Sequence, residues 1–215
     1  MKKLIILVLV LGLVGVASAG TLVVPATDDA QVDEANPDHA YGLGGYMYIS
    51  GLSGYDRDGY FMFDTSAIPA GQTITSASLT TKIHVNSTTG DTADFYSVAN
   101  DSWDESTITY NNAPAAGSTA LFSIYVNGTG VEGGVAGSPQ VDSTDVTSYV
   151  ASSYAGSDSL ISFAATGGIG GLFIRSKEDS LGRDIPSVEL TVNYVPEPMT
   201  IALLGLGGLF LRKRK

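Results

Sequence analysis

The sequence predicts a single all-β domain, an antiparallel β-sandwich that contains one short helix. The middle of the 215-residue chain is rich in Gly, Ser, Thr, Asn and Asp, and short runs of β-branched and aromatic residues recur there every ten to twenty residues. In the longest runs, apolar and polar residues alternate with the period of two that is typical of a half-buried strand. No repeat of fixed length is visible, which disfavours a solenoid.

The clearest predicted strand covers Ala77–Val85. Its alternate residues from Leu79 onward are expected in the core, whereas Thr80, Lys82 and His84 are expected to face water. The segment Ser187–Tyr194 has the same alternation. Further strands are predicted over residues 22–24, 46–50, 60–63, 95–98, 121–126, 160–164 and 172–175. About nine short strands favour a sandwich.

One segment has a helical rather than a strand pattern. Between Asp145 and Tyr154, the apolar residues Val146, Tyr149 and Val150 fall at positions i, i+3 and i+4. Gly156 follows, as is common just after a helix end. We therefore expect one short helix inside the β-domain.

The N-terminus has the three parts of a secretory signal peptide. Two lysines precede an apolar run from Leu4 to Val16, and Ala17 and Ala19 then supply the small residues that signal peptidase requires. Cleavage is predicted between Ala19 and Gly20. A permanent membrane helix is the alternative, but it needs ~20 apolar residues. The sequence therefore predicts export and removal of this signal helix.

The C-terminus begins with a Pro-Glu-Pro motif, formed by Val195, Pro196, Glu197 and Pro198. An apolar stretch follows over residues 199–211, and residues 212–215 are all basic. We expect the prolines to stop the last strand and the basic end to remain cytoplasmic. At 1.5 Å per residue this apolar helix is about 20 Å long, shorter than the ~30 Å hydrocarbon core. It suits a transient stop signal better than the alternative, a permanent anchor.

This tail resembles the PEP-CTERM sorting signal. The resemblance implies that a membrane enzyme, an exosortase, recognises Val195–Pro198 and processes the tail. The chain is accordingly divided into a signal peptide (residues 1–19), a β-sandwich domain (20–194) and a sorting signal (195–215). The expected location is the cell surface and the extracellular matrix.

The domain is strongly acidic. Between Gly20 and Val195 there are 21 acidic and five basic residues, a formal charge of −16. Such a surface repels phosphate, so nucleic acid and anionic lipid are excluded as partners of the domain. The absence of cysteine excludes disulfides, thiolate ligands and thiol nucleophiles. Any bound glycan is expected to be neutral or bridged by cations.

Close acidic residues suggest structural calcium, because carboxylate oxygens are the ligands that this ion prefers. Three groups are candidates: Asp28 with Asp29 and Asp33; Asp56 with Asp58; and Asp101 with Asp104 and Glu105. None has the spacing of an EF-hand loop. An ordinary solvated acidic surface is the alternative for each group.

Several short motifs, in order along the domain, resemble a DNRLRE domain. They cover residues 26–32, 40–42, 59–71, 76–79, 103–114, 145–150, 173–178 and 185–194. Tyr110 stands where this family usually has Trp. The resemblance implies a jelly-roll-like sandwich in a secreted protein, related to carbohydrate-binding modules. Because Asp29 falls on the family's recurring Asp, the first acidic group is the preferred calcium site.

Aromatic residues are the candidate glycan contacts, because a flat ring packs against a pyranose. Tyr41, Tyr46, Tyr48 and Tyr55 lie in turn-rich segments and form the candidate platform. Some of them are expected in the core, since Tyr46 and Tyr48 share one strand face. Trp103 is a further candidate, but packing inside the domain with its N–H satisfied is the favoured interpretation.

The sequence predicts a protein that binds extracellular polysaccharide without catalysis. No catalytic residue is assigned: His39 and His84 lack metal-ligand spacing, and no GxSxG motif is present. Two alternatives stay open, a purely structural or adhesive surface protein and a small polysaccharide lyase or hydrolase. A tyrosine-lined groove would favour binding, whereas two close carboxylates of raised pKa inside it would favour hydrolysis.

Overall fold

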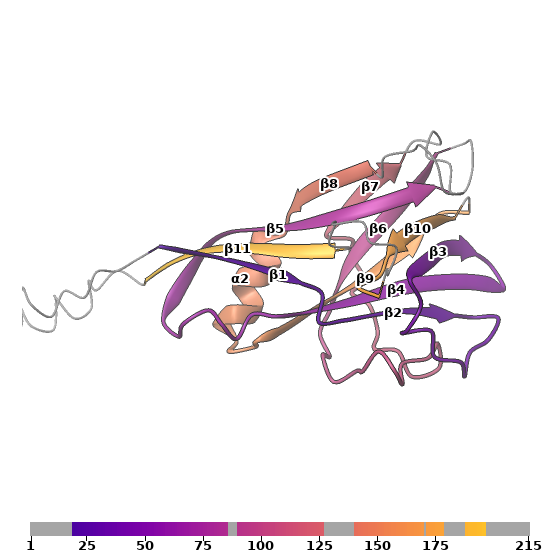
Figure 1. The fold of residues 1–215 in the computed structure, drawn as a ribbon, viewed down its shortest axis with the longest axis horizontal. Coiled ribbons are helices and arrows are strands. Elements are labelled where there is room, and N and C mark those ends of the chain that lie inside the picture. The colour runs from indigo at the N-terminus through magenta and orange to yellow at the C-terminus, as the bar shows by residue number, and fades with distance from the viewer. Residues whose placement is uncertain (1–18, 86–89, 127–139, 170, 179–187, 197–215) are drawn as a thin grey trace, which may run out of the picture.

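A computed structural model describes residues 19–85, 90–126, 140–169, 171–178 and 188–196. These residues form eleven strands and one short helix, so the predicted all-β sandwich is confirmed (Figure 1). The predicted signal helix and C-terminal apolar helix fall on residues 1–18 and 197–215, outside the described part. Within the described residues, no helix has the length and apolar character needed to cross a membrane.

Two antiparallel layers make up the domain. The first consists of β1 (Gly20–Pro25), β11 (Val188–Pro196), β5 (Gln72–Val85), β10 (Leu172–Arg175) and β3 (Tyr46–Leu52), with β8 (Gln140–Asp145) on the other edge of β5. The second consists of β2 (Asp28–Asp33), β4 (Tyr55–Asp64), β9 (Leu160–Gly167), β6 (Asp91–Val98) and β7 (Phe122–Val126). The hairpin from β3 to β4 joins the layers.

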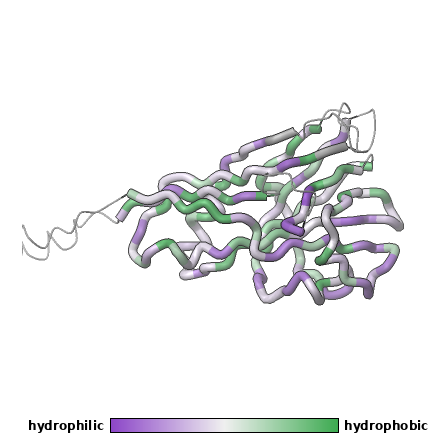
Figure 2. Tube along the Cα trace, in the orientation of Figure 1, coloured by the Kyte–Doolittle hydropathy of each residue, from purple (hydrophilic) through white to green (hydrophobic). Residues whose placement is uncertain are grey.

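The main core lies between the two layers, where the inner faces of the strands meet. Leu79 and Ile83 of β5, Leu190 of β11, and Phe61 and Phe163 of the second layer are fully buried there. Apolar segments occur along the strands of both layers (Figure 2). This is the result of the period-two alternation that predicted the fold.

A second, smaller core covers the outer face of the second layer. Residues 99–121, which connect β6 to β7 and are called here the covering segment, pack Ile108 and Trp103 against Tyr60 and Val32. Strand β4 is therefore apolar on both faces over residues 60–63, which explains why that run does not alternate.

The structure has two strands that the sequence did not predict, β2 and β8. Both are short and rich in Asp, Ser, Thr or Gln, which lowers their strand propensity. Lys82 lies on the face opposite Ile83, as predicted, but the residue is only 9% exposed. Its strand is flanked on both edges, so neighbouring side chains shield the long lysine stem. The side chain of His84 lies outside the described part.

The predicted helix is α2 (Thr147–Ala155), which buries Val150 in the main core and is followed by Gly156 as expected. Both ends of the domain lie together: Gly20 pairs with Tyr194, and Pro196 ends β11 opposite Gln72 (Figure 1). Proline suits the last position of a strand, because it has no backbone N–H to donate to the hydrogen bonds of a longer sheet. Strand β11 thus extends into the Pro-Glu-Pro motif.

Candidate functional site

Three carboxylates from distant parts of the chain meet at the edge of the second layer. Asp29 is on β2, Glu105 belongs to the covering segment, and Glu178 follows β10. Each offers an oxygen, and these oxygens all lie within 4.8 Å of one another. No other group of three or more acidic or histidine side chains within the described ranges has this spacing. We call these three residues the carboxylate cluster.

Asp29 is the buried member of the carboxylate cluster, with no exposed surface. Its Oδ2 accepts a hydrogen bond from the backbone N–H of Lys177 at 2.7 Å, and its own N–H donates to Glu105 Oε2 at 3.3 Å. Its Oδ1 has no hydrogen-bond partner. Burial, and then the negative charge of Glu178, raise the pKa of Asp29 to about 8.

Lys177 is the cation beside the carboxylate cluster. Its Nζ lies 2.5 Å from Glu105 Oε2 and 3.6 Å from Glu178 Oε1, and it donates to the Thr27 carbonyl at 2.5 Å. Glu178 still has one buried oxygen, Oε2, without a partner. The ammonium therefore contacts two of the three carboxylates, and one oxygen of Asp29 and one of Glu178 have no hydrogen-bond partner.

The structure does not bring the first predicted acidic group together. Asp28 and Asp29 are consecutive in a strand, so their side chains point to opposite faces. Asp33 shares the face of Asp29 but pairs with Arg57, Oδ2 to Nε, at 3.1 Å, and its Oδ1 accepts from the Ala35 N–H. Asp29 alone of this group joins the carboxylate cluster.

The second predicted acidic group, Asp56 and Asp58, lies on the outer face of the second layer with Tyr60. Burial, and then the charge of Asp56, raise the pKa of Asp58 to about 7, and its Oδ1 is buried without a partner. Because this pair lacks a third carboxylate within ligand spacing, it does not form a comparable cluster among the described residues.

The third predicted acidic group is divided. Glu105 points to Asp29, whereas Asp104 is exposed and accepts from the Ser106 backbone N–H at 2.8 Å, as a turn cap. Asp101 interacts with Ser162 and Asp158 instead, and burial raises its pKa. Only the sequence motif around residues 173–178 pointed to Glu178, which was not predicted as a ligand.

Two of the candidate tyrosines form an aromatic surface with a residue that was not predicted. Phe173 of β10 pairs in register with Tyr48 of β3, and its ring centroid lies 4.8 Å from that of Tyr48 and 5.2 Å from that of Tyr46. Met47 and Ile49 take the core face of β3, so these three rings lie on the outer face of the first layer. We call Tyr46, Tyr48 and Phe173 the aromatic face.

Exposure and charge distinguish the members of the aromatic face. Tyr46 is 56% exposed, whereas Phe173 is buried beneath its neighbours. The guanidinium carbon of Arg57 lies 5.2 Å from the centroid of the Tyr48 ring, and Arg175 pairs in register with Tyr46. The aromatic face therefore offers one accessible ring at a site flanked by cationic side chains.

The remaining tyrosine candidates, Tyr55 at the start of β4 and Tyr41 in an irregular segment, lie outside the aromatic face. Tyr55 is 57% exposed in the hairpin between β3 and β4, and Tyr41 packs edge-on against His39 with the ring centroids 4.4 Å apart. None of the four candidate tyrosines is buried, so the expectation that some of them belong to the core was wrong. Met47 and Ile49 supply the apolar side chains that tyrosines were expected to provide.

Trp103 lies over the outer face of the second layer. Its Nε1–H donates to Ser162 Oγ at 3.1 Å, and its ring meets Tyr60 edge-on with the centroids 5.9 Å apart. Its indole is half-buried in the smaller core. These contacts agree with a packing role, which the sequence favoured.

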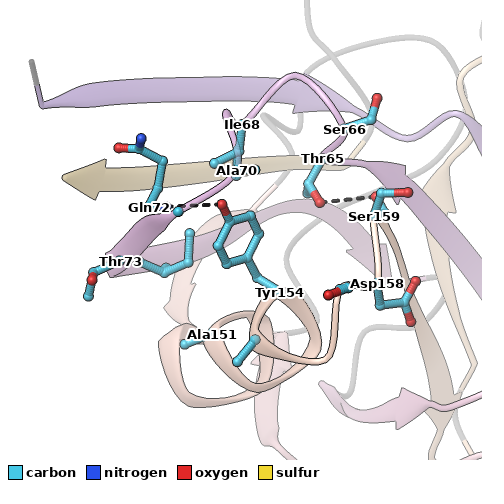
Figure 3. Close-up of a pocket in the computed structure, with 14 residues that line it drawn as sticks. Thr65, Ser66, Ile68, Ala70, Gln72, Thr73, Ala151, Tyr154, Asp158 and Ser159 are labelled. Atoms are coloured by element: carbon cyan, nitrogen blue, oxygen red, sulfur yellow. Dashed lines mark hydrogen bonds between the residues drawn. The ribbon is translucent and has the colours of Figure 1, made fainter. Parts of the chain in front are cut away.

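An open cavity of about 690 Å³ lies between the turn from β4 to β5 and the end of α2 (Figure 3). Among the described residues, the aromatic lining residue is Tyr154, whose hydroxyl donates to the Pro69 carbonyl at 2.6 Å and accepts from the Gln72 N–H at 3.3 Å. Asp158 is the carboxylate that this part of the chain adds to the lining. Gln72 also pairs with Pro196, so this cavity adjoins the domain ends.

The chain is similar to a known protein family. The family described as carbohydrate-binding module family 96 matches residues 21–182, a range that includes both the aromatic face and the carboxylate cluster. No curated protein matches the chain.

Proposed function

The chain belongs to carbohydrate-binding module family 96, and from this premise we propose that it is an exported surface protein that binds polysaccharide, without catalysis, at its aromatic face. The observation that carries the choice of site is the exposed ring of Tyr46, seated on Phe173 beside Tyr48. A rigid aromatic ring offers a large apolar surface at low entropic cost, and its phenol end bonds to hydroxyl groups. Sugar rings present the matching combination of C–H faces and hydroxyls.

The position of the aromatic face supports this choice over the cavity. Strand β10 pairs with the end of β5 near Ile83, whereas Pro196 pairs with Gln72 at its other end. At 3.3 Å per residue these two places are about 35 Å apart along β5. A chain held through its C-terminus therefore directs the aromatic face outward, whereas the cavity lies beside the end of β11, where Gln72 pairs with Pro196. Figure 1 shows β3 and β10 at the other end of the domain.

The arrangement of carboxylates supports binding without chemistry. Glycoside hydrolysis ordinarily uses two carboxyl groups on either side of the scissile bond. The cavity is lined by one carboxylate, Asp158. Asp29, whose pKa is raised most clearly, has no exposed surface for a sugar to reach. The described part of the chain thus favours a binding module over a lyase or hydrolase.

Export and sorting complete the proposed function. Signal peptidase cleaves before Gly20, which is also the first residue of β1. An exosortase then recognises Val195–Pro198, and the apolar tail holds the chain in the membrane only transiently. The partner is an extracellular polysaccharide, neutral or bridged by cations, because the domain has 21 acidic residues and five basic ones, and Arg57 beside the aromatic face is already paired with Asp33.

A panel of purified polysaccharides tests this function, with affinity electrophoresis and calorimetry on the purified protein. Tyr46→Ala is expected to weaken binding by roughly threefold to tenfold, the value of one aromatic contact. The matched control is Ala155→Trp, which fills the cavity from an exposed helix position and is expected to leave affinity unchanged.

The opposite pattern, with affinity lost in Ala155→Trp and kept in Tyr46→Ala, would move the site to the cavity. If the unmodified protein binds none of the polysaccharides, with or without calcium, the proposed function is wrong and the structural or adhesive alternative is favoured.

A further inference from the structure

The carboxylate cluster has the composition and geometry of a cation site, and we propose that Asp29, Glu105 and Glu178 bind one calcium ion that ties together three distant segments of the chain. These residues come from β2, the covering segment and the turn after β10. The sequence had placed Asp29 and Glu105 in separate acidic groups. The proposed ion does not depend on polysaccharide binding.

The unpaired oxygens are the first argument. Asp29 Oδ1 and Glu178 Oε2 are both buried and both lack a hydrogen-bond partner, and the Asp29 side chain has no exposed surface. Buried polar groups are nearly always paired, because removing them from water without a partner is costly. Solvated surface carboxylates, the alternative raised by the sequence, do not fit a side chain that water cannot reach.

The distances are the second argument. Calcium binds oxygen at 2.3–2.6 Å, so two oxygens on opposite sides of one ion are about 5 Å apart. The three cluster oxygens lie within 4.8 Å of one another, so one ion placed between them is close to bonding distance from all three. Calcium tolerates irregular geometry and backbone carbonyl ligands, whereas magnesium demands a small, regular octahedron.

Charge is the third argument. A bound cation would keep all three carboxylates ionised; they then carry −3, and the Lys177 ammonium supplies +1, which leaves −2. A divalent cation neutralises this remainder. Lys177 is also held by the Thr27 carbonyl, so its ammonium has a partner other than the carboxylates. The competing account is that no metal binds: the raised pKa of Asp29 keeps a proton on it that hydrogen-bonds to Glu178, and Lys177 balances the remaining charge.

The location explains what the ion would stabilise. The covering segment carries Trp103 and closes the smaller core, and Gly42 packs so closely on the Glu105 backbone that an added Cβ would lie 1.8 Å from its carbonyl oxygen. Ser176, two residues before Glu178, donates to the Gly44 carbonyl. An ion at the carboxylate cluster would therefore connect β2, the covering segment and the turn after β10.

The experiment is a calorimetric titration of the purified, chelator-treated full chain with calcium chloride, paired with melting curves in calcium and in EDTA at fixed ionic strength. One ion per chain is expected. At a free concentration one hundred times Kd, calcium should raise Tm by roughly 5–10 °C over EDTA. Magnesium is expected to bind at least about tenfold more weakly.

Three substitutions distinguish the cluster from its surroundings. Asp29→Asn is expected to weaken calcium binding by about tenfold or more, whereas Asp28→Asn, an identical change on the opposite face of the strand, should alter it by less than about threefold. Lys177→Met removes the competing ammonium and should tighten calcium binding.

If titration of the unmodified chain gives no heat of calcium binding, and its Tm is the same in calcium and in EDTA, the proposal is overturned. A preference for magnesium would overturn the assignment to calcium. Equal losses in Asp29→Asn and Asp28→Asn would place the ion elsewhere. If the Lys177→Met chain binds calcium no more tightly than the unmodified chain, the ammonium does not compete with an ion at the cluster, and the proposed position of the ion is wrong.

Discussion

Replacing Trp103 with Phe separates a packing role from a sugar-binding role. In the structure the indole N–H donates to Ser162 Oγ at 3.1 Å, and Ser162 is fully buried. The ring also covers Tyr60 at the smaller core. Phenylalanine keeps an aromatic ring but removes the donor and part of the apolar area. A packing role therefore predicts lower stability with unchanged polysaccharide affinity.

The size of the loss follows from these contacts. One hydrogen bond to a buried hydroxyl contributes about 1 kcal/mol. The smaller ring covers roughly 40 Å² less apolar surface, or about 1 kcal/mol at 25 cal/mol per Å². The sum is about 2 kcal/mol, which for a domain of this size lowers Tm by roughly 4–8 °C. Tyr46→Ala, at a ring that is 56% exposed, should lower Tm far less.

Thermal unfolding followed by circular dichroism, together with polysaccharide affinity of the same two variants, decides the question. The two variants are expected to have opposite effects. Trp103→Phe should lower Tm and keep polysaccharide affinity, whereas Tyr46→Ala should keep Tm nearly unchanged and lower polysaccharide affinity. If Trp103→Phe keeps its Tm and loses polysaccharide affinity, the packing argument is refuted, and Trp103 instead contacts the polysaccharide.

Three further predictions concern pH, sorting and catalysis. The pKa of Asp58 rises from 3.8 to about 7 on folding, so between these values the folded state holds a proton that the unfolded state has lost; stability therefore falls as pH rises through this window, by up to ~4 kcal/mol from this group. Asp58→Asn should become more stable relative to the unmodified protein between pH 4 and pH 7.5 in chemical denaturation, and a constant difference would contradict the raised pKa. Mass spectrometry of the mature protein should show the tail removed near Pro198, and an intact Met199–Lys215 segment would exclude exosortase processing. No reducing ends or unsaturated sugars should appear from common polysaccharides, and a product that is lost on mutation of one carboxylate would show that the protein is an enzyme.

The sequence by itself determined the fold class and most of the core. Alternating residues in β5 and β11 placed Leu79 and Leu190 correctly in the interior, because the period of two is a local property of the extended backbone. The short helix was also predicted from a local pattern, because Val146 and Val150 are one helical turn apart. Local patterns did not predict β2 and β8, because the residues of these two strands have low strand propensity.

The tertiary structure decided which side chains meet. Adjacency in sequence grouped Asp29 with Asp28, but neighbours in a strand point to opposite faces, so proximity along the chain did not become proximity in space. Glu105 and Glu178 reach Asp29 through the covering segment and the turn after β10, and Phe173 reaches Tyr46 through strand pairing. Such contacts depend on sheet order and register, which no local spacing encodes.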